Sequence, residues 1–174
     1  LVALGADGTW RVTPGGTELA TTRAQEAHAD RIASLGSVVA TFEDATEALT
    51  AWVEPNSGAA PTVNLSIPGT PIDLAVGHNH IAVISADTLV VTGYAIAGDR
   101  LDLDGSRATA APFVDGSAAV LQAVAMDESQ LYLLTDHGVL VYDPANLALA
   151  PRRALLAPGD APTGTAMAPL GGSL

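Results

Sequence analysis

Two histidines separated by one residue are the first candidates for chemistry in this sequence. His78 and His80 flank Asn79 in a short polar segment between two apolar runs. Side chains two residues apart on an extended chain point to the same side, and imidazole is a common zinc ligand. Asp73 or Asp127 would have to supply a further ligand. A shared metal ion is therefore one hypothesis, and the preferred interpretation is a polar loop between two strands with both histidines solvated.

An acidic segment further along the chain is a candidate for binding calcium. Asp102 and Asp104 precede Gly105. An EF-hand loop needs oxygen ligands at its first, third and fifth positions, glycine at the sixth and glutamate at the twelfth. With Gly105 in the sixth place, Arg100 falls in the first and Ala111 in the twelfth, so the EF-hand pattern fails. A looser calcium loop remains as a hypothesis, and the alternative is an acidic outer strand facing water.

Several acids fall in short turns that separate apolar runs. If the runs pair as hairpins of one repeat, the acids in these turns gather on one face. Carboxylates arranged in this way can hold cations or dock a basic partner, although aspartate is also a usual turn residue. The candidates for binding a partner are Asp7, Asp44, Asp87 and Asp136.

Nucleophilic and nucleotide-dependent chemistry have no support in the sequence. The chain has no cysteine, no Gly-x-Ser-x-Gly segment, no Gly-x-Gly-x-x-Gly segment and no Walker A segment. The remaining serines, histidines and aspartates are too common to indicate a catalytic set without geometry. We therefore predict no catalytic residue and no cofactor.

Charge narrows the range of partners. The 174 residues carry 19 acids against 7 bases, all of them arginine, for a formal net charge of −12. Such a field repels nucleic-acid phosphates and anionic lipid. The sequence also has no run of roughly 18 apolar residues that would span a membrane. We expect a protein or cell-envelope partner, with no nucleic acid and no membrane insertion, and the sequence leaves the oligomeric state open.

An internal repeat organises the chain. Residues 1–14 consist of an apolar run, a four-residue turn with Asp and Gly, and a second apolar run that ends at a proline. Residues 131–144 repeat this pattern, residues 81–94 form a third copy, and residues 38–53 form a looser fourth copy. The runs are too short for helices and are rich in Val, Ile, Leu and Tyr, so each copy is predicted to be a β-hairpin.

Further strand candidates flank these hairpins. Small apolar segments precede three of them, at residues 31–35, 72–76 and 121–126, and weaker candidates follow at residues 19–22, 62–67, 101–104 and 153–156. An inner strand, a hairpin and an outer strand make one four-stranded antiparallel blade. The sequence therefore predicts an all-β fold, as a β-propeller or propeller fragment of about four such blades.

The predicted repeat units divide one domain. A repeat-built domain of residues 1–164 contains units at about 1–24, 25–70, 71–117 and 118–160. Residues 165–168 resemble the inner-strand segment of residues 124–127, so the C-terminal segment of residues 165–174 is a candidate for the strand that closes the first blade. The alternative is that the chain is part of a larger ring. Residues 25–31 are expected to form a helical turn, because residues 24–33 are locally rich in helix formers.

The fourth hairpin carries a family resemblance. Its apolar run of residues 131–134, its turn with Asp136 and Gly138, and its second run that ends at Asp143 resemble a PQQ-like β-propeller repeat of bacterial proteins, the YVTN or quinoprotein type. The resemblance implies a fold and no activity. It extends to the blade alone, so it does not imply that pyrroloquinoline quinone is bound.

Three functions agree with these observations. The first is a non-catalytic extracytoplasmic module, extracellular or in the cell envelope, that presents its loops to a binding partner. The second is a carbohydrate-active enzyme domain, which would need two carboxylates facing each other roughly 5–10 Å apart. The third is a structural repeat of a larger surface protein.

Overall fold

The fold is all-β and antiparallel. The computed structural model describes residues 2–4, 10–12, 23–25, 30–53, 65–66, 70–98, 100–114, 116–149 and 151–153. Within these ranges every regular element is a β-strand, every pairing of strands is antiparallel, and no helix is long and apolar enough to cross a membrane. The predicted all-β class is confirmed.

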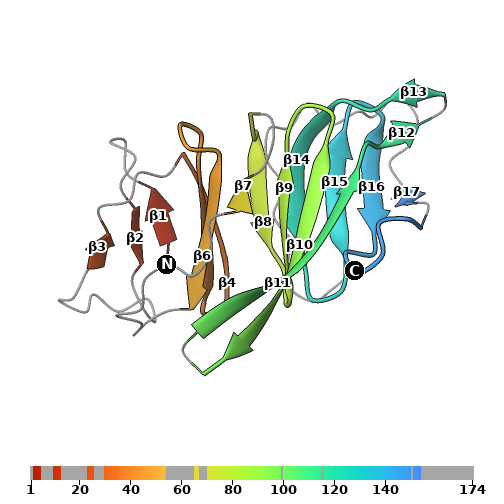
Figure 1. The fold of residues 1–174 in the computed structure, drawn as a ribbon. Helices are drawn as coiled ribbons and strands as arrows, with labels where there is room; N and C mark the ends of the chain where they lie inside the picture. The colour runs from red at the N-terminus through yellow and green to blue at the C-terminus, as the bar shows by residue number, and fades with distance from the viewer. Residues whose placement is uncertain are drawn as a thin grey trace.

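The described strands form up-and-down sheets in chain order (Figure 1). The first sheet contains β1 (Val2–Leu4), β2 (Trp10–Val12) and β3 (Arg23–Gln25). The second contains β4 (Arg31–Leu35), β5 (Val38–Glu43), β6 (Ala48–Val53) and β7 (Leu65–Ser66). The third contains β8 (Asp73–Val76), β9 (His80–Ile84), β10 (Leu89–Ala97) and β11 (Arg100–Ala110). The fourth contains β14 (Leu121–Met126), β15 (Leu131–Thr135), β16 (Gly138–Tyr142) and β17 (Arg152–Arg153).

The four predicted hairpins are present as β1–β2, β5–β6, β9–β10 and β15–β16. Val, Ile and Leu fill these strands because branched apolar side chains pack well on a half-buried pleated surface. The turn before β16 reaches Gly138 at a φ of 104°, a conformation that favours glycine. The three predicted inner strands are β4, β8 and β14, each paired with the first strand of its hairpin.

The sheets lie side by side in a row, with β1–β3 at one end and β14–β17 at the other (Figure 1). The inner strands are neighbours, since β8 contacts both β4 and β14. Two apolar cores fill the spaces between sheets. One joins the second and third sheets through residues such as Phe42, Leu49 and Ile81, and the other joins the third and fourth sheets through residues such as Ile84, Leu131 and Leu133.

Polar side chains link the inner strands β4 and β8 to the next sheet. The Arg31 guanidinium in β4 donates to the carbonyl oxygens of Pro71, at 2.9 Å, and Ile72, at 3.3 Å, just before β8. The Asp73 carboxylate in β8 accepts a hydrogen bond of 2.8 Å from the backbone N–H of Val124 in β14. Arg31 and Asp73 both pair with the last apolar residue of the neighbouring hairpin strand, so they hold equivalent places in the repeat.

Several elements differ from the sequence-based expectations. The strands β10 and β11 extend together into a ribbon beyond the rest of their sheet (Figure 1), whereas the described parts of the outer strands β7 and β17 contain two residues each. A small hairpin of β12 (Phe113–Val114) and β13 (Ser117–Ala118) was not expected, and it crosses the predicted boundary between units at residues 117 and 118. The expected helical turn at residues 25–31 is wrong at both ends, because Gln25 ends β3 and Arg31 begins β4. The candidate strand at residues 19–22 and the candidate closing segment at residues 165–174 lie outside the described residues.

Candidate functional site

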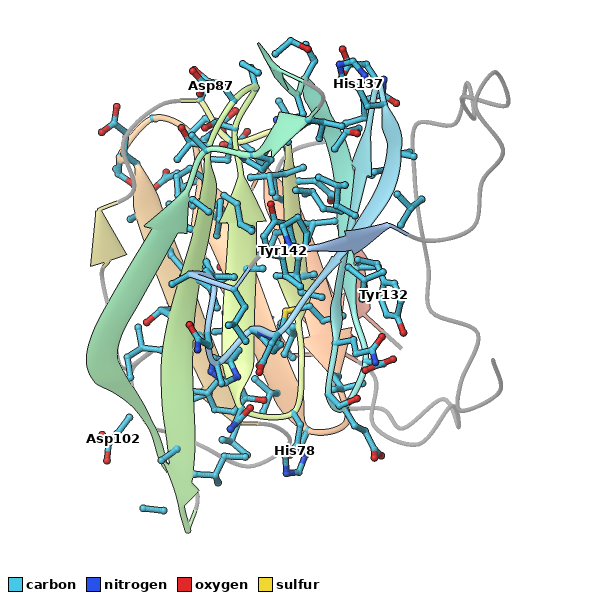
Figure 2. All side chains as sticks on the ribbon, turned by 90° about the vertical axis from the view of Figure 1, so that its right-hand side faces the viewer. His78, Asp87, Asp102, Tyr132, His137 and Tyr142 are labelled. Carbon is cyan, nitrogen blue, oxygen red and sulfur yellow. The ribbon has the colours of Figure 1, made fainter. Side chains whose placement is uncertain are left out.

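The hairpin turns of successive sheets lie at one end of the molecule. Figure 2 places Asp87, in the β9–β10 turn, and His137, in the β15–β16 turn, at one end, and His78 at the opposite end. Backbone bonds link these turns to the starts of inner strands, because Leu121 N–H donates to Ala86 O and Asp136 N–H donates to Val120 O. We call this end, with the turns that contain Asp44, Asp87 and Asp136, the hairpin-turn end. Asp7 lies outside the described residues.

The acids of the second sheet form a local network at this end. The backbone N–H of Asp44 donates to Asp30 Oδ2 at 2.7 Å, and Arg31 Nη2 lies 3.7 Å from Asp44 Oδ2. Both members of this ion pair are about one-third exposed, with side-chain values of 31% and 36%. Solvent screens such a pair, so it contributes little to stability and leaves the Asp44 carboxylate within reach of a partner.

The acids of the third and fourth sheets are exposed. Asp87 Oδ1 accepts a hydrogen bond of 2.9 Å from the Thr88 hydroxyl, and Asp136 Oδ1 accepts one of 2.9 Å from the Val120 N–H. These bonds fix the turns in place, as aspartate does in many turns. Each carboxylate therefore has a structural role and also faces solvent.

One arrangement at this end resembles a catalytic triad in composition only. Ser117 Oγ lies 3.4 Å from His137 Nε2, and Asp136 Oδ2 lies 3.8 Å from the same nitrogen. In a Ser-His-Asp triad the carboxylate bonds Nδ1 while the serine uses Nε2, which lets the carboxylate fix the tautomer. Because both partners here approach one nitrogen, the arrangement cannot activate the serine in that way.

The predicted histidine pair lies at the turn between β8 and β9, where His78 is in the turn at the opposite end of the molecule and His80 is the first residue of β9. The turn between β8 and β9 is closed by a hydrogen bond of 2.8 Å from Gly77 N–H to His80 O. Tyr94 binds the same turn twice, because its N–H donates to Asn79 O at 2.8 Å and its hydroxyl donates to Gly77 O at 2.6 Å. Burial raises the pKa of Tyr94 to about 12, so this hydroxyl keeps its proton at all ordinary pH values.

The acids proposed to join the histidines are engaged elsewhere. Asp73 begins β8 and bonds Val124, whereas the turn with His78 follows the end of that strand. Asp127 Oδ1 accepts from the N–H groups of Ser129 and Gln130, and its Oδ2 accepts from the Tyr132 hydroxyl at 2.7 Å. Desolvation raises the pKa of Asp127, but these hydrogen bonds outweigh it and hold the pKa below its ordinary value.

The calcium candidates lie on the ribbon of β10 and β11. Asp102 pairs with Ala95 on this ribbon, and the backbone of Asp104 lies two residues further along β11. Figure 2 shows Asp102 well away from the hairpin-turn end. Across the described part of the chain, no three His, Asp or Glu side chains come together in a way that could hold a metal ion.

Sequence reasoning missed the polar contacts that surround the hairpin-turn acids. Arg31 and His137 place a basic group beside Asp44 and Asp136. The contact between His137 and Asp136 could have been predicted, because the two residues are adjacent in the sequence. The contact of Arg31 with Pro71 could not, because it depends on how two sheets pack together. Neither a protein-family model nor a curated protein matches the chain.

Proposed function

We propose that this chain is a non-catalytic binding module on a propeller-type scaffold, acting outside the cytoplasm or in the cell envelope. Consecutive up-and-down sheets, packed face to face with their inner strands adjacent, support this scaffold. The four-stranded composition of the second, third and fourth sheets agrees with the blades of that fold. The location rests on the resemblance of residues 131–143 to bacterial propeller repeats.

The hairpin-turn end is the proposed binding surface, and its partner is a positively charged protein segment. The observation that carries the proposal is the repetition of an acid in successive hairpin turns, at Asp44, Asp87 and Asp136. Figure 2 shows Asp87 and His137, the residue after Asp136, at one end of the molecule. Asp44 lies beside Arg31, which bonds the carbonyl oxygen of Ile72, and the N–H of Ile72 bonds Ile84 next to the turn with Asp87. Acidic side chains on a common face attract and orient a basic partner over distances of about 10 Å at moderate salt. The net charge of −12 adds to this attraction.

A matched pair of variants tests this proposal with an arginine-rich peptide as the probe. One variant carries D44N, D87N and D136N, and the other carries D102N, E128Q and D143N, which neutralise the same number of acids elsewhere. We expect the first variant to bind the peptide at least about tenfold more weakly than the second, and to show a smaller dependence of affinity on salt. Isothermal titration calorimetry at several salt concentrations measures both quantities.

Equal weakening in the two variants would contradict the proposal, because it would mean that net charge alone attracts the peptide. Thermal unfolding of each variant is the control for folding. Asparagine keeps the acceptor oxygen that Asp136 offers to Val120, so we expect the turn to persist.

A further inference from the structure

Two large apolar side chains are exposed at the hairpin-turn end. Ile72 lies directly before β8 and is 38% exposed, and Val120 lies directly before β14 and is 53% exposed. The corresponding place before β4 is occupied by Asp30. Exposed apolar residues that occur singly are common on protein surfaces. These two share a further property, because the backbone places each of them between two acids of the hairpin turns.

The backbone of Val120 joins the turn of the third sheet to the turn of the fourth. Its N–H donates to Asp136 Oδ1 at 2.9 Å, and its carbonyl oxygen accepts from the N–H of Asp136 at 3.1 Å. The N–H of the next residue, Leu121, donates to the carbonyl oxygen of Ala86 at 2.9 Å, and Ala86 is adjacent to Asp87. Val120 therefore lies between Asp87 and Asp136, and hydrogen bonds on both sides hold its backbone there.

Ile72 joins the second and third sheets in the same way. Its N–H donates at 2.8 Å to the carbonyl oxygen of Ile84, the last residue of β9 before the turn that contains Asp87. Its carbonyl oxygen accepts from Arg31 Nε at 3.3 Å, and Nη2 of the same guanidinium lies 3.7 Å from Asp44 Oδ2. Ile72 therefore lies between Asp44 and Asp87.

Acids and exposed apolar side chains thus alternate across the hairpin-turn end. From the second sheet to the fourth, the members of this row are Asp44, Ile72, Asp87, Val120 and Asp136. Figure 2 shows the part of the row near Asp87 and His137. Carboxylates attract a basic segment over a distance but discriminate little between one cation and another. Apolar side chains act on contact, and they favour a partner that covers them and removes them from water.

We infer that the hairpin-turn end recognises a protein segment that carries large apolar side chains between its arginine or lysine residues. The basic groups of this segment face the carboxylates, while its apolar groups cover Ile72 and Val120. A polybasic segment without apolar side chains would leave both residues in contact with water. Because backbone hydrogen bonds hold the row in place before the partner arrives, little ordering of this surface opposes binding. This inference rests on the proposed function and specifies its partner.

Two peptides of equal length and equal charge test the requirement for apolar side chains. One repeats the unit Arg-Gly-Leu-Gly and the other repeats Arg-Gly-Ser-Gly, so that in an extended peptide arginine shares one face with leucine or with serine. We expect the wild-type chain to bind the leucine peptide at least about tenfold more tightly, because only leucine buries apolar surface against Ile72 and Val120. Isothermal titration calorimetry measures both affinities. Their ratio should persist at high salt, since salt screens charges and not apolar contacts.

A matched pair of double variants identifies the side chains responsible for this preference. I72S with V120S removes the apolar side chains of the row and keeps their backbone hydrogen bonds. I96S with L149S removes two side chains of similar exposure, 48% and 56%, on the β10–β11 ribbon and after β16. We expect the first variant to lose the preference for the leucine peptide and the second to keep it. Thermal unfolding checks that each variant folds.

The outcomes separate this inference from the proposed function. Equal affinity of the wild-type chain for both peptides would overturn the inference and leave the proposed function intact, provided that D44N, D87N and D136N together still weaken binding. A preference that survives I72S with V120S would also overturn it, because other apolar groups would then be responsible. If neither peptide binds, or if the three acid substitutions leave binding unchanged, the proposed function is wrong and the inference is wrong with it.

Discussion

Asp127 stabilises the turn between β14 and β15 by accepting hydrogen bonds from three residues. The donors are the N–H groups of Ser129 and Gln130 and the hydroxyls of Ser129 and Tyr132. Each donor favours the carboxylate over the protonated acid, which is why the pKa of Asp127 lies below its ordinary value. A carboxyl with a lowered pKa stabilises the folded state above the pKa of the unfolded chain, and this stabilisation disappears as the pH falls through the folded pKa.

We therefore expect D127N to lower the free energy of unfolding at pH 7 and to have less effect in acid. Asparagine keeps one acceptor oxygen but loses the charge that strengthens these hydrogen bonds. The difference between wild type and D127N should narrow once the pH falls below about 4, where the unfolded carboxyl is protonated. Urea unfolding of both chains between pH 7 and pH 3 measures this difference. A constant difference across this range would contradict the assigned role.

The sequence predicted the positions of turn residues better than the contacts of residues whose partners are distant in the sequence. Asp44, Asp87 and Asp136 were assigned to turns because their neighbours in the sequence define the turn. The sequence suggested Asp127 as a metal ligand, whereas its carboxylate accepts hydrogen bonds from residues only two to five positions away. Arg31 and Asp73 could not be assigned, since their acceptor and donor belong to other sheets.

The ribbon of β10 and β11 is the element that departs most from the repeat. The second hairpin strand was expected to end near Tyr94, but β10 continues to Ala97 and β11 returns from Arg100. The pairing shifts between Thr92 and Tyr94, as at a β-bulge, which bends a strand and increases its twist. The strand β11 also contacts β6 of the neighbouring sheet, and no local pattern in the sequence indicates this contact.

Two residues that face each other on this ribbon should differ sharply in their contribution to stability. Leu101 is 0% exposed and belongs to the core between the second and third sheets, whereas its partner Ile96 is 48% exposed. We expect L101A to lower the free energy of unfolding by about 2–4 kcal/mol, as buried leucines do. I96A is the matched control and should cost less than about 1 kcal/mol. Urea unfolding measures both, and similar losses would show that the ribbon is not anchored through Leu101.

At the scale of the whole molecule, the sequence repeat predicted the individual sheets but not how the sheets pack on one another. Periodic apolar runs identify strands and turns because these depend on neighbours in the sequence. The row of sheets in Figure 1 depends on which face of each sheet packs on the next. That choice follows from equivalent positions such as Ala33, Ala75 and Ala125, whose common role is visible only once the strands are paired.

The imbalance of charge predicts how salt acts on the whole molecule. With 19 acids and 7 bases, repulsion between carboxylates outweighs attraction in ion pairs such as Arg31–Asp44, whose exposure makes it weak. Raising the salt concentration from 0.01 M to 0.1 M shortens the screening length from about 30 Å to about 10 Å. Screening therefore removes more repulsion than attraction, and we expect the melting temperature to rise by a few degrees.

Thermal unfolding in sodium chloride, followed by circular dichroism, measures this effect. The D44N, D87N and D136N variant should show a smaller rise, because it has lost three of the charges that repel one another at the hairpin-turn end. A melting temperature that falls with salt would mean that attractive ion pairs dominate the folded state. An equal rise of the melting temperature in the variant would mean that the repulsion is spread over the whole surface. The acids of the hairpin-turn end would then contribute no more to this repulsion than other acids do.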